Sequence, residues 1–190
     1  MELSLENRAQ WLKFWSECYG YPQPHLYDAN IRIPLTADSI VELFTWKNGT
    51  PLSQKKAASV VANYVSAVNA IPMLASVEDG RKYIKNVSGG AIWRIFWLHC
   101  LNPDMFPIFD QHTYRAMHWI KNGQVQELPA YNPSKIQIYF DRYLPFWDEF
   151  EGVNERALDR ALFAYGKSKK QKVSSSTPKV TALKSLAPSS

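Results

Sequence analysis

Apolar residues recur along most of this chain at the three- and four-residue spacing of helices, and prolines and glycines separate the runs. The first run predicts a helix over residues 4–19 with one broad apolar face. Three prolines between residues 22 and 34 then predict an extended connection. Thr36 and Asp38 predict the start of a second helix, and Asn48-Gly49 predicts its end.

Two serines have the sequence context of helix caps. Ser53 precedes an apolar stripe that runs through Val68, so a longer helix is expected there. Ser76, with Asp79 three residues later, resembles a capping box in which Asp replaces Glu. The sequence therefore predicts a short helix from Ser76 to about Lys85.

The segment SGGAIWRIFWLHCL, residues 88–101, is apolar on nearly every side. Such a helix is buried at the centre of a domain rather than amphipathic at its surface. Arg94 lies within it and must reach a carboxylate, a carbonyl or water, because an unpaired buried charge costs several kcal/mol. We expect Arg94 to form an ion pair.

The remaining pattern is also helical. A helix beginning at or near Asp110 passes through Ile120, and two more cover residues 133–150 and 154–166, the last capped by Asn154 and ended near Gly166. The segment QVQEL, residues 124–128, has the pattern of a short strand, but no segment near it is a clear pairing partner. The predicted class is all-α: one compact helical domain over residues 1–166, followed by a tail, with no internal repeat.

The net charge of +5 is concentrated in the tail. Residues 167–190 hold six lysines and no acid, and without them 16 basic residues face 17 acidic ones. Because this tail is rich in Ser, Lys and Pro, we expect residues 167–190 to be disordered, either attracting a polyanion or promoting solubility. KSKKQK also fits a short nuclear signal. The near-neutral body gives no charge argument for nucleic acid.

Composition excludes some classes of protein. No run approaches the roughly 18 apolar residues of a membrane span, and the N-terminus lacks the basic-then-apolar order of a secretory signal. Cys18 and Cys100 lie in aromatic-rich helical stretches and are expected to be buried thiols. Their number suggests a reducing compartment, so the expected location is cytoplasmic, or at the nucleoid in a bacterium.

The turn before the apolar helix is a candidate anion site. Gly89 and Gly90, preceded by Ser88, allow a partner to approach the backbone closely, and the free amides at a helix start attract a phosphate. The alternative is a glycine pair that only permits tight helix packing.

Asp110 is the candidate catalytic residue. It follows the stiff apolar run FPIF and precedes a helix. An aspartate there is a favoured N-cap, worth roughly 1 kcal/mol. A carboxylate fixed at a helix start in an apolar pocket can also stabilise a developing cation or orient a water. Phe106, Pro107 and Phe109 would supply the walls of that pocket.

His112 and Arg115 follow on the same helix. Helical geometry places them away from Asp110 and near each other, where they form either a phosphate contact or a solvated face. The histidines and cysteines show no metal-ligand spacing, so neither a metal nor a cofactor is predicted. No phosphate-binding Walker loop or nucleophile motif is present.

The stretch FPIFDQHTYRAM resembles the segment (F)P-h-h-D-x-H/N-h-x-R-h, with h apolar, of the helix–hairpin–helix DNA glycosylase superfamily. That superfamily includes the 8-oxoguanine and adenine glycosylases and endonuclease III. The resemblance covers mainly residues 87–117, and ALDRALFAYGK, residues 157–167, is similar to the late helix of such domains.

The resemblance implies a flipped base from duplex DNA in a pocket, with Asp110 stabilising the sugar cation while Ser88, Gly89, Gly90, His112 and Arg115 contact DNA. Trp93, Trp97 and Trp119 are then possible aromatic walls, or core residues. The chain departs from the family at KNVSGGAIWR, where the hairpin lysine of bifunctional members is absent, and it has no four-cysteine cluster motif.

Three functions follow from these observations. The first is a monofunctional glycosylase that releases a damaged or modified base. The second is a module of the same fold that binds DNA or protein without catalysis. The third is a nucleotide-modification enzyme of phage or bacterial type with the same pocket.

Overall fold

The computed structural model describes residues 5–32 and 34–170, and all regular structure in them is helical. The order of the elements is α1 (Leu5–Glu17), α2 (Pro24–Asp28), α3 (Ala37–Asn48), α4 (Gln54–Val60), η1 (Val61–Val65), η2 (Val68–Ala70), α5 (Val77–Lys85), α6 (Ala91–Leu101), α7 (Gln111–Asn122), α8 (Asn132–Ile138), η3 (Tyr139–Tyr143), α9 (Leu144–Asp148) and α10 (Glu155–Ser168). The all-α prediction is confirmed for these residues. The predicted tail lies outside the described residues from 171 onward.

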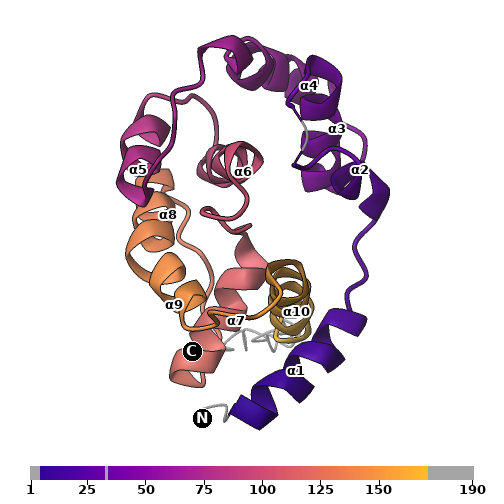
Figure 1. The fold of residues 1–190 in the computed structure, drawn as a ribbon, viewed down its shortest axis with the longest axis vertical. Helices are drawn as coiled ribbons and strands as arrows, with labels where there is room; N and C mark the ends of the chain where they lie inside the picture. The colour runs from indigo at the N-terminus through magenta and orange to yellow at the C-terminus, as the bar shows by residue number, and fades with distance from the viewer. Residues whose placement is uncertain (1–4, 33, 171–190) are drawn as a thin grey trace, which may run out of the picture.

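Helix α6 lies in the middle of the molecule, surrounded by the other helices (Figure 1). Ile95 and Leu98 pack into one hydrophobic core with residues of α5 and of α7 to α10. Phe96 and Trp97, on another side of α6, pack into a second core with residues of α2, α3 and η1. Because both cores use α6, its sequence is apolar nearly all round, as predicted for a central helix.

Several predicted caps are present. Thr36 accepts a hydrogen bond from the amide of Ser39 at the start of α3, and Gly49 ends that helix with φ 73°. Ser76 accepts from the amide of Asp79 at the start of α5, and Asn154 accepts from the amide of Ala157 in α10. These local signals fix helix ends because each satisfies an amide that has no partner inside the helix.

Other predictions are wrong in detail. The proline-rich connection contains the short helix α2, since proline fits the first turn of a helix. Residues 124–128 form no strand; instead the Leu128 amide donates to Gln111 Oε1 over 3.0 Å. The thiol of Cys18 is exposed, whereas that of Cys100 is buried as expected. Helix α10 continues past Gly166 to Ser168.

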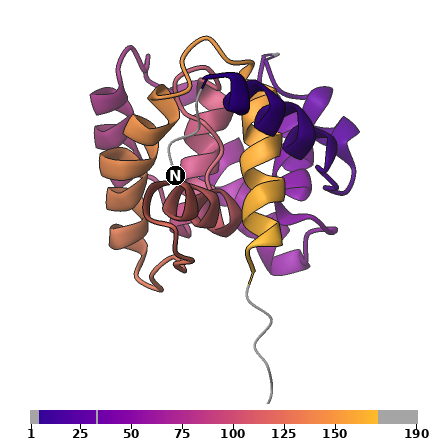
Figure 2. The same ribbon diagram turned by 90° about the horizontal axis from the view of Figure 1, so that it is seen from below.

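The last helix packs closely against α7. A Cβ atom on Gly166 would lie 1.8 Å from the carbonyl oxygen of His112, so only glycine permits this approach. Helix α1 lies across α10 on its other side (Figure 2). No helix within the described ranges is long and apolar enough to cross a bilayer.

Candidate functional site

The segment before Asp110 is held by buried hydrogen bonds. His99 Nδ1 lies 2.8 Å from the carbonyl oxygen of Phe106. The hydroxyls of Tyr139 and Tyr143 donate to the carbonyl oxygens of Pro107 and Ile108, each over 3.1 Å. Three successive carbonyls are therefore bound by side chains of α6 and η3, which fixes the chain where it enters α7.

Asp110 caps α7 and also forms an ion pair. Its Oδ1 accepts from the amides of His112 (2.8 Å) and Thr113 (3.1 Å). Its Oδ2 lies 3.2 Å from Nζ of Lys47, in the last turn of α3. The Lys47 side chain is only 6% exposed and that of Asp110 is 19% exposed. Asp110 therefore combines capping of α7 with an ion pair to α3.

The environment of Asp110 favours its ionised form. Burial alone would raise the pKa of the carboxyl, but the Lys47 ammonium, His112 and the two amides outweigh it. The pKa of Asp110 therefore lies below its usual value. At neutral pH the helix start carries a fixed negative charge.

Asp110 lines a pocket of about 460 Å³, here called the Asp110 pocket. Its other walls include Tyr21, Ile92, His112, Lys135 and Phe163. Ile92 belongs to the first turn of α6, so the pocket reaches that turn, but Ser88, Gly89 and Gly90 are not among its lining residues. The rings of Tyr21 and Phe163 lie edge to face, with centroids 5.2 Å apart.

The predicted walls of this pocket are wrong. Phe106 and Phe109 are fully buried in the core that includes α7 to α10. Pro107 and Ile108 face a different cavity, between α2 and α10. The apolar run before Asp110 is thus a core segment that positions the acid rather than a wall around it.

His112 and Arg115 lie near each other, as predicted, with 3.2 Å between Nδ1 and Nη1. Neither belongs to a solvated face: Arg115 is buried and binds both oxygens of Glu127, over 2.8 and 2.7 Å. His112 shares the pocket with Asp110 instead of turning away. Burial lowers the pKa of His112, and Arg115, Lys167 and Lys47 lower it further. Arg115 thus orients His112 and Glu127.

The glycine turn is exposed at the start of α6. Gly89 has φ 109°, and a Cβ atom there would lie 2.8 Å from the hydroxyl of Tyr64, which itself donates to the carbonyl of Ser88 over 3.4 Å. Gly90 is the N-cap of α6 without a side-chain cap, and a Cβ atom on it would meet nothing within 4 Å. Gly89 is therefore needed for the backbone, whereas Gly90 leaves the helix start open.

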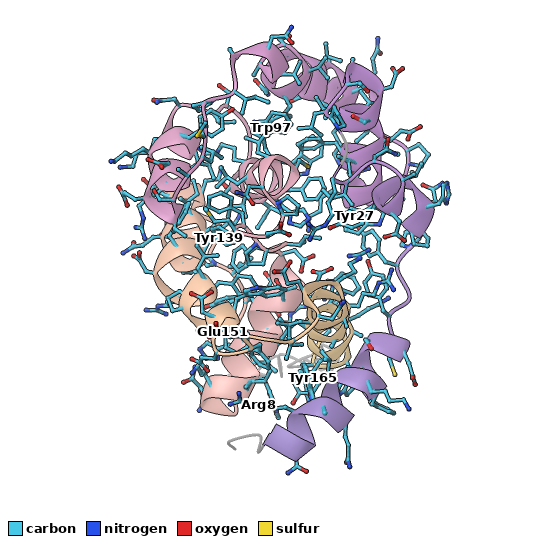
Figure 3. The ribbon with its side chains drawn as sticks, in the orientation of Figure 1. Arg8, Tyr27, Trp97, Tyr139, Glu151 and Tyr165 are labelled. Atoms are coloured by element: carbon cyan, nitrogen blue, oxygen red, sulfur yellow. The ribbon has the colours of Figure 1, made fainter. Side chains whose placement is uncertain are left out.

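Three other residues of α6 have structural roles. Arg94 donates to the carbonyls of Ile84 (3.2 Å) and Val87 (3.3 Å), so it caps the end of α5 and the expected ion pair is wrong. Trp97 is fully buried and donates to Tyr83 over 3.0 Å (Figure 3). Trp93 packs on Phe44. The tryptophans of this helix thus belong to the core rather than to a ligand site.

A second polar cluster lies between α2, α6 and α10. Arg156 Nη1 binds Asp159 Oδ2 over 2.6 Å, and its guanidinium lies 4.0 Å from the ring centre of Tyr27. The Tyr27 hydroxyl, on the inner side of α2, is 2.7 Å from His99 Nε2 (Figure 3). Burial lowers the pKa of His99 to about 3 and raises that of Asp159 to about 6.

Sequence reasoning missed Lys47, Phe163 and Asp159. Lys47 precedes Asn-Gly at a helix end, where a lysine normally only complements the helix dipole, so the sequence gives no sign of its burial. Asp159 offered a signal: it lies four residues before Phe163 and next to Leu158, on the apolar side of the last helix. Within residues 5–32 and 34–170, no group of three or more His, Cys, Asp or Glu residues could hold a metal ion.

Comparisons with protein-family models, with curated proteins and with solved structures gave no match to this chain.

Proposed function

We propose that this protein is a monofunctional DNA glycosylase-like enzyme that releases a damaged or modified base, with Asp110 as its catalytic carboxylate. The observation that carries the proposal is the position of Asp110: an ionised acid, fixed at a helix start, on the wall of a pocket that also contains aromatic rings. The resemblance of FPIFDQHTYRAM to the glycosylase segment supplies the reaction class.

The surroundings of the pocket suit a nucleotide. Lys135 lines the pocket, and Lys47 and Lys167 act electrostatically on His112 in its wall. Lys135 is thus available to a phosphate, whereas the charge of Lys47 is balanced by Asp110. Tyr21 and Phe163 offer aromatic surfaces for a base, which recovers part of the cost of flipping it from the stack.

The proposed reaction requires mainly electrostatic stabilisation from the protein. When the N-glycosidic bond breaks, its electron pair leaves with the base and the sugar becomes an oxocarbenium-like cation. A carboxylate held in place before the reaction stabilises that charge without reorganising. A water molecule then attacks the sugar carbon and loses a proton, leaving an abasic site.

Lys47 places an amine beside the catalytic acid, although the glycine turn holds no lysine. Its Nζ forms an ion pair with Asp110, and an ammonium in an ion pair has no free electron pair with which to attack a sugar. We therefore assign Lys47 to positioning Asp110, and expect hydrolysis without a Schiff base.

One observation favours the alternative of a binding module without catalysis. Both carboxylate oxygens of Asp110 already have partners, two amides on Oδ1 and Lys47 on Oδ2. A purely structural cap and ion pair would look the same, and the open start of α6 could still bind a phosphate.

The deciding experiment incubates the purified protein with duplexes that each carry one lesion or modified base. Abasic sites are revealed by alkaline cleavage, and covalent complexes by borohydride trapping. We expect base release from one class of duplex, no trapped complex, and a loss of roughly a hundredfold or more in Asp110→Asn. The matched control is Asp148→Asn, which changes an exposed aspartate of α9.

Equal duplex binding by wild type and Asp110→Asn, with no base release from any substrate, would replace the enzyme with the binding module. A trapped complex that disappears in Lys47→Met would overturn the positioning role of Lys47. Removing residues 171–190 leaves α10 intact and takes away three of the six lysines of the basic tail: salt-dependent binding that survives the truncation belongs to residues 1–170.

A further inference from the structure

The cavity between α2 and α10 is separate from the Asp110 pocket and is smaller and more closed. It has a volume of about 160 Å³, and its walls include Tyr27, Ile31, His99, Trp147, Arg156 and Asp159. A cavity of about 150 Å³ accommodates benzene. The size of this cavity, called here the Asp159 cavity, therefore matches one six-membered ring with small substituents.

The polar end of this cavity presents hydrogen-bond acceptors. Asp159 Oδ2 accepts from Arg156 over 2.6 Å, while no hydrogen bond from the described residues reaches Oδ1. A carbonyl oxygen can only accept, so His99 Nδ1 carries the proton that it shares with Phe106, and His99 Nε2 accepts from the Tyr27 hydroxyl. The Tyr27 oxygen keeps a lone pair of its own.

Donors are scarce at the same end. Nε and Nη2 of Arg156 are buried without a hydrogen-bond partner, and the guanidinium lies over the Tyr27 ring. Arg156 balances the charge of Asp159 and lies 3.7 Å from Asp28 Oδ1 as well, and because its Nε and Nη2 are closed off from solvent they are not presented to a ligand. A molecule in the cavity must supply donors itself, and it needs no net charge, because the acid already has its counter-ion.

The remaining lining residues are of two kinds. Trp147, Ile31 and Pro107 are among the apolar ones, and Asp28, Arg32 and Glu155 are charged. At the rim, Arg32 forms ion pairs with Asp104 and Glu155, and all three side chains are well exposed. Arg32 and Glu155 of these pairs also line the cavity.

We infer that the Asp159 cavity binds a free, small nitrogen heterocycle that carries an amino group, of the type of cytosine, with the amino N–H donating to Asp159. Aromatic and aliphatic side chains contact the ring. The two acceptors, Asp159 Oδ1 and the Tyr27 hydroxyl oxygen, favour an amino group over a carbonyl. The inference does not depend on glycosylase activity, because it concerns a different site and a ligand that is not cleaved.

The test compares 1-methylcytosine with 1-methyl-2-pyrimidinone, which have nearly the same shape and the same ring nitrogens but differ in the presence of the amino group. Isothermal calorimetry and protein-observed NMR on the full chain measure their affinities. We expect 1-methylcytosine to bind about tenfold more tightly or better, since a buried acceptor left unpaired by the base without an amino group costs about 1–3 kcal/mol. Cytidine, whose sugar exceeds the space, should bind more weakly than 1-methylcytosine.

Two variants distinguish a loss of ligand binding from a loss of the fold. Asp159→Asn offers an amide in place of the acid and should remove the preference for 1-methylcytosine. Ile31→Phe fills the cavity while leaving Asp159 in place, and should abolish binding of both bases. Asp148→Asn, on exposed α9, should bind like wild type. No binding of 1-methylcytosine by folded wild type, equal binding of the two bases, or an unchanged preference in folded Asp159→Asn would overturn the inference.

Discussion

Asp110 and Asp159 are both largely buried aspartates beside a cation, yet their pKa values move in opposite directions. Burial is the largest influence on each and raises both. Asp110 gains two backbone amides as well as Lys47, and its pKa falls below the usual value. Asp159 has one hydrogen bond, from Arg156, and its pKa rises to about 6.

The difference lies in what opposes burial: at Asp110 the Lys47 ammonium, His112 and two amides together outweigh it, whereas at Asp159 the cations Arg156 and Lys47 are opposed by the charge of Asp110 and do not. The amides of a helix start cost nothing extra to align, because the helix holds them in place. Asp159 lies inside α10, and within the described residues no backbone amide is recorded as donating to its carboxylate. A helix start therefore suits a permanent charge, and a helix interior suits an acid that titrates near pH 6.

The largest expected effect comes from breaking the contact between α7, which Asp110 caps, and α10, which contains Asp159. Gly166→Ala places a Cβ atom 1.8 Å from the His112 carbonyl oxygen, so the helices must separate. We expect a loss of about 3 kcal/mol or more in the free energy of unfolding, measured by urea denaturation. Gly20→Ala is the control, because nothing lies within 4 Å of its Cβ position. A loss below about 1 kcal/mol would contradict the close packing.

The pH dependence of stability should separate the two acids. A carboxyl whose pKa is raised in the folded state to about 6, from 3.8, stabilises the fold below pH 3.8, and that stabilisation disappears as the pH rises through about 6. Two pKa units correspond to roughly 3 kcal/mol. Relative to Asp159→Asn, wild type should therefore lose stability between pH 4 and 6.

For Asp110 the sign is reversed. Its folded pKa is lowered, so its contribution is present above the unfolded value and is lost as the pH falls below it. Urea denaturation of wild type, Asp159→Asn and Asp110→Asn from pH 3 to pH 7 measures both slopes. If the free energy of unfolding changed with pH in the same way in all three proteins, the opposite pKa shifts of the two acids would be contradicted.

Removing the cation from Asp110 should be the next effect in size. Lys47→Met keeps the volume of a buried side chain but leaves the acid with its two amides, and we expect a loss of about 2 kcal/mol and a higher pKa for Asp110. The carboxyl carbon resonance of Asp110 reports that pKa by NMR. Lys121→Met, in an exposed ion pair with Glu149, should change stability by less than about 1 kcal/mol.

The smallest effect concerns a cap remote from both acids. Ser76→Ala removes the acceptor for the Asp79 amide at the start of α5, which should cost about 1 kcal/mol. Because α5 carries neither acid, the slopes with pH should stay as in wild type. If the free energy of unfolding of Ser76→Ala changed with pH differently from wild type, the pH dependence would reflect general destabilisation rather than the titration of Asp110 and Asp159.

The sequence predicted what depends on neighbours along the chain. Thr36, Ser76, Asp110 and Asn154 act as caps through amides two or three residues away, so their context identifies them. The apolar pattern of α6 identified the central helix for the same reason.

What the sequence could not predict depends on distant contacts. Lys47 is 63 residues from Asp110, and nothing in its own segment marks it as a buried partner. The π-helical segments η1 and η3 shift the apolar stripes of two helices, so Val61 is exposed while Tyr139 and Tyr143 turn inward.

Helix α6 contributes side chains to both hydrophobic cores. Neither set of helices around it can therefore keep its own interior if α6 leaves, and separate fragments of the chain should not hold their structure. The molecule should unfold in one cooperative transition, with the amides of α6 among the last to exchange their hydrogens with solvent. A ligand that binds in either cavity should therefore raise the free energy of unfolding of the whole protein.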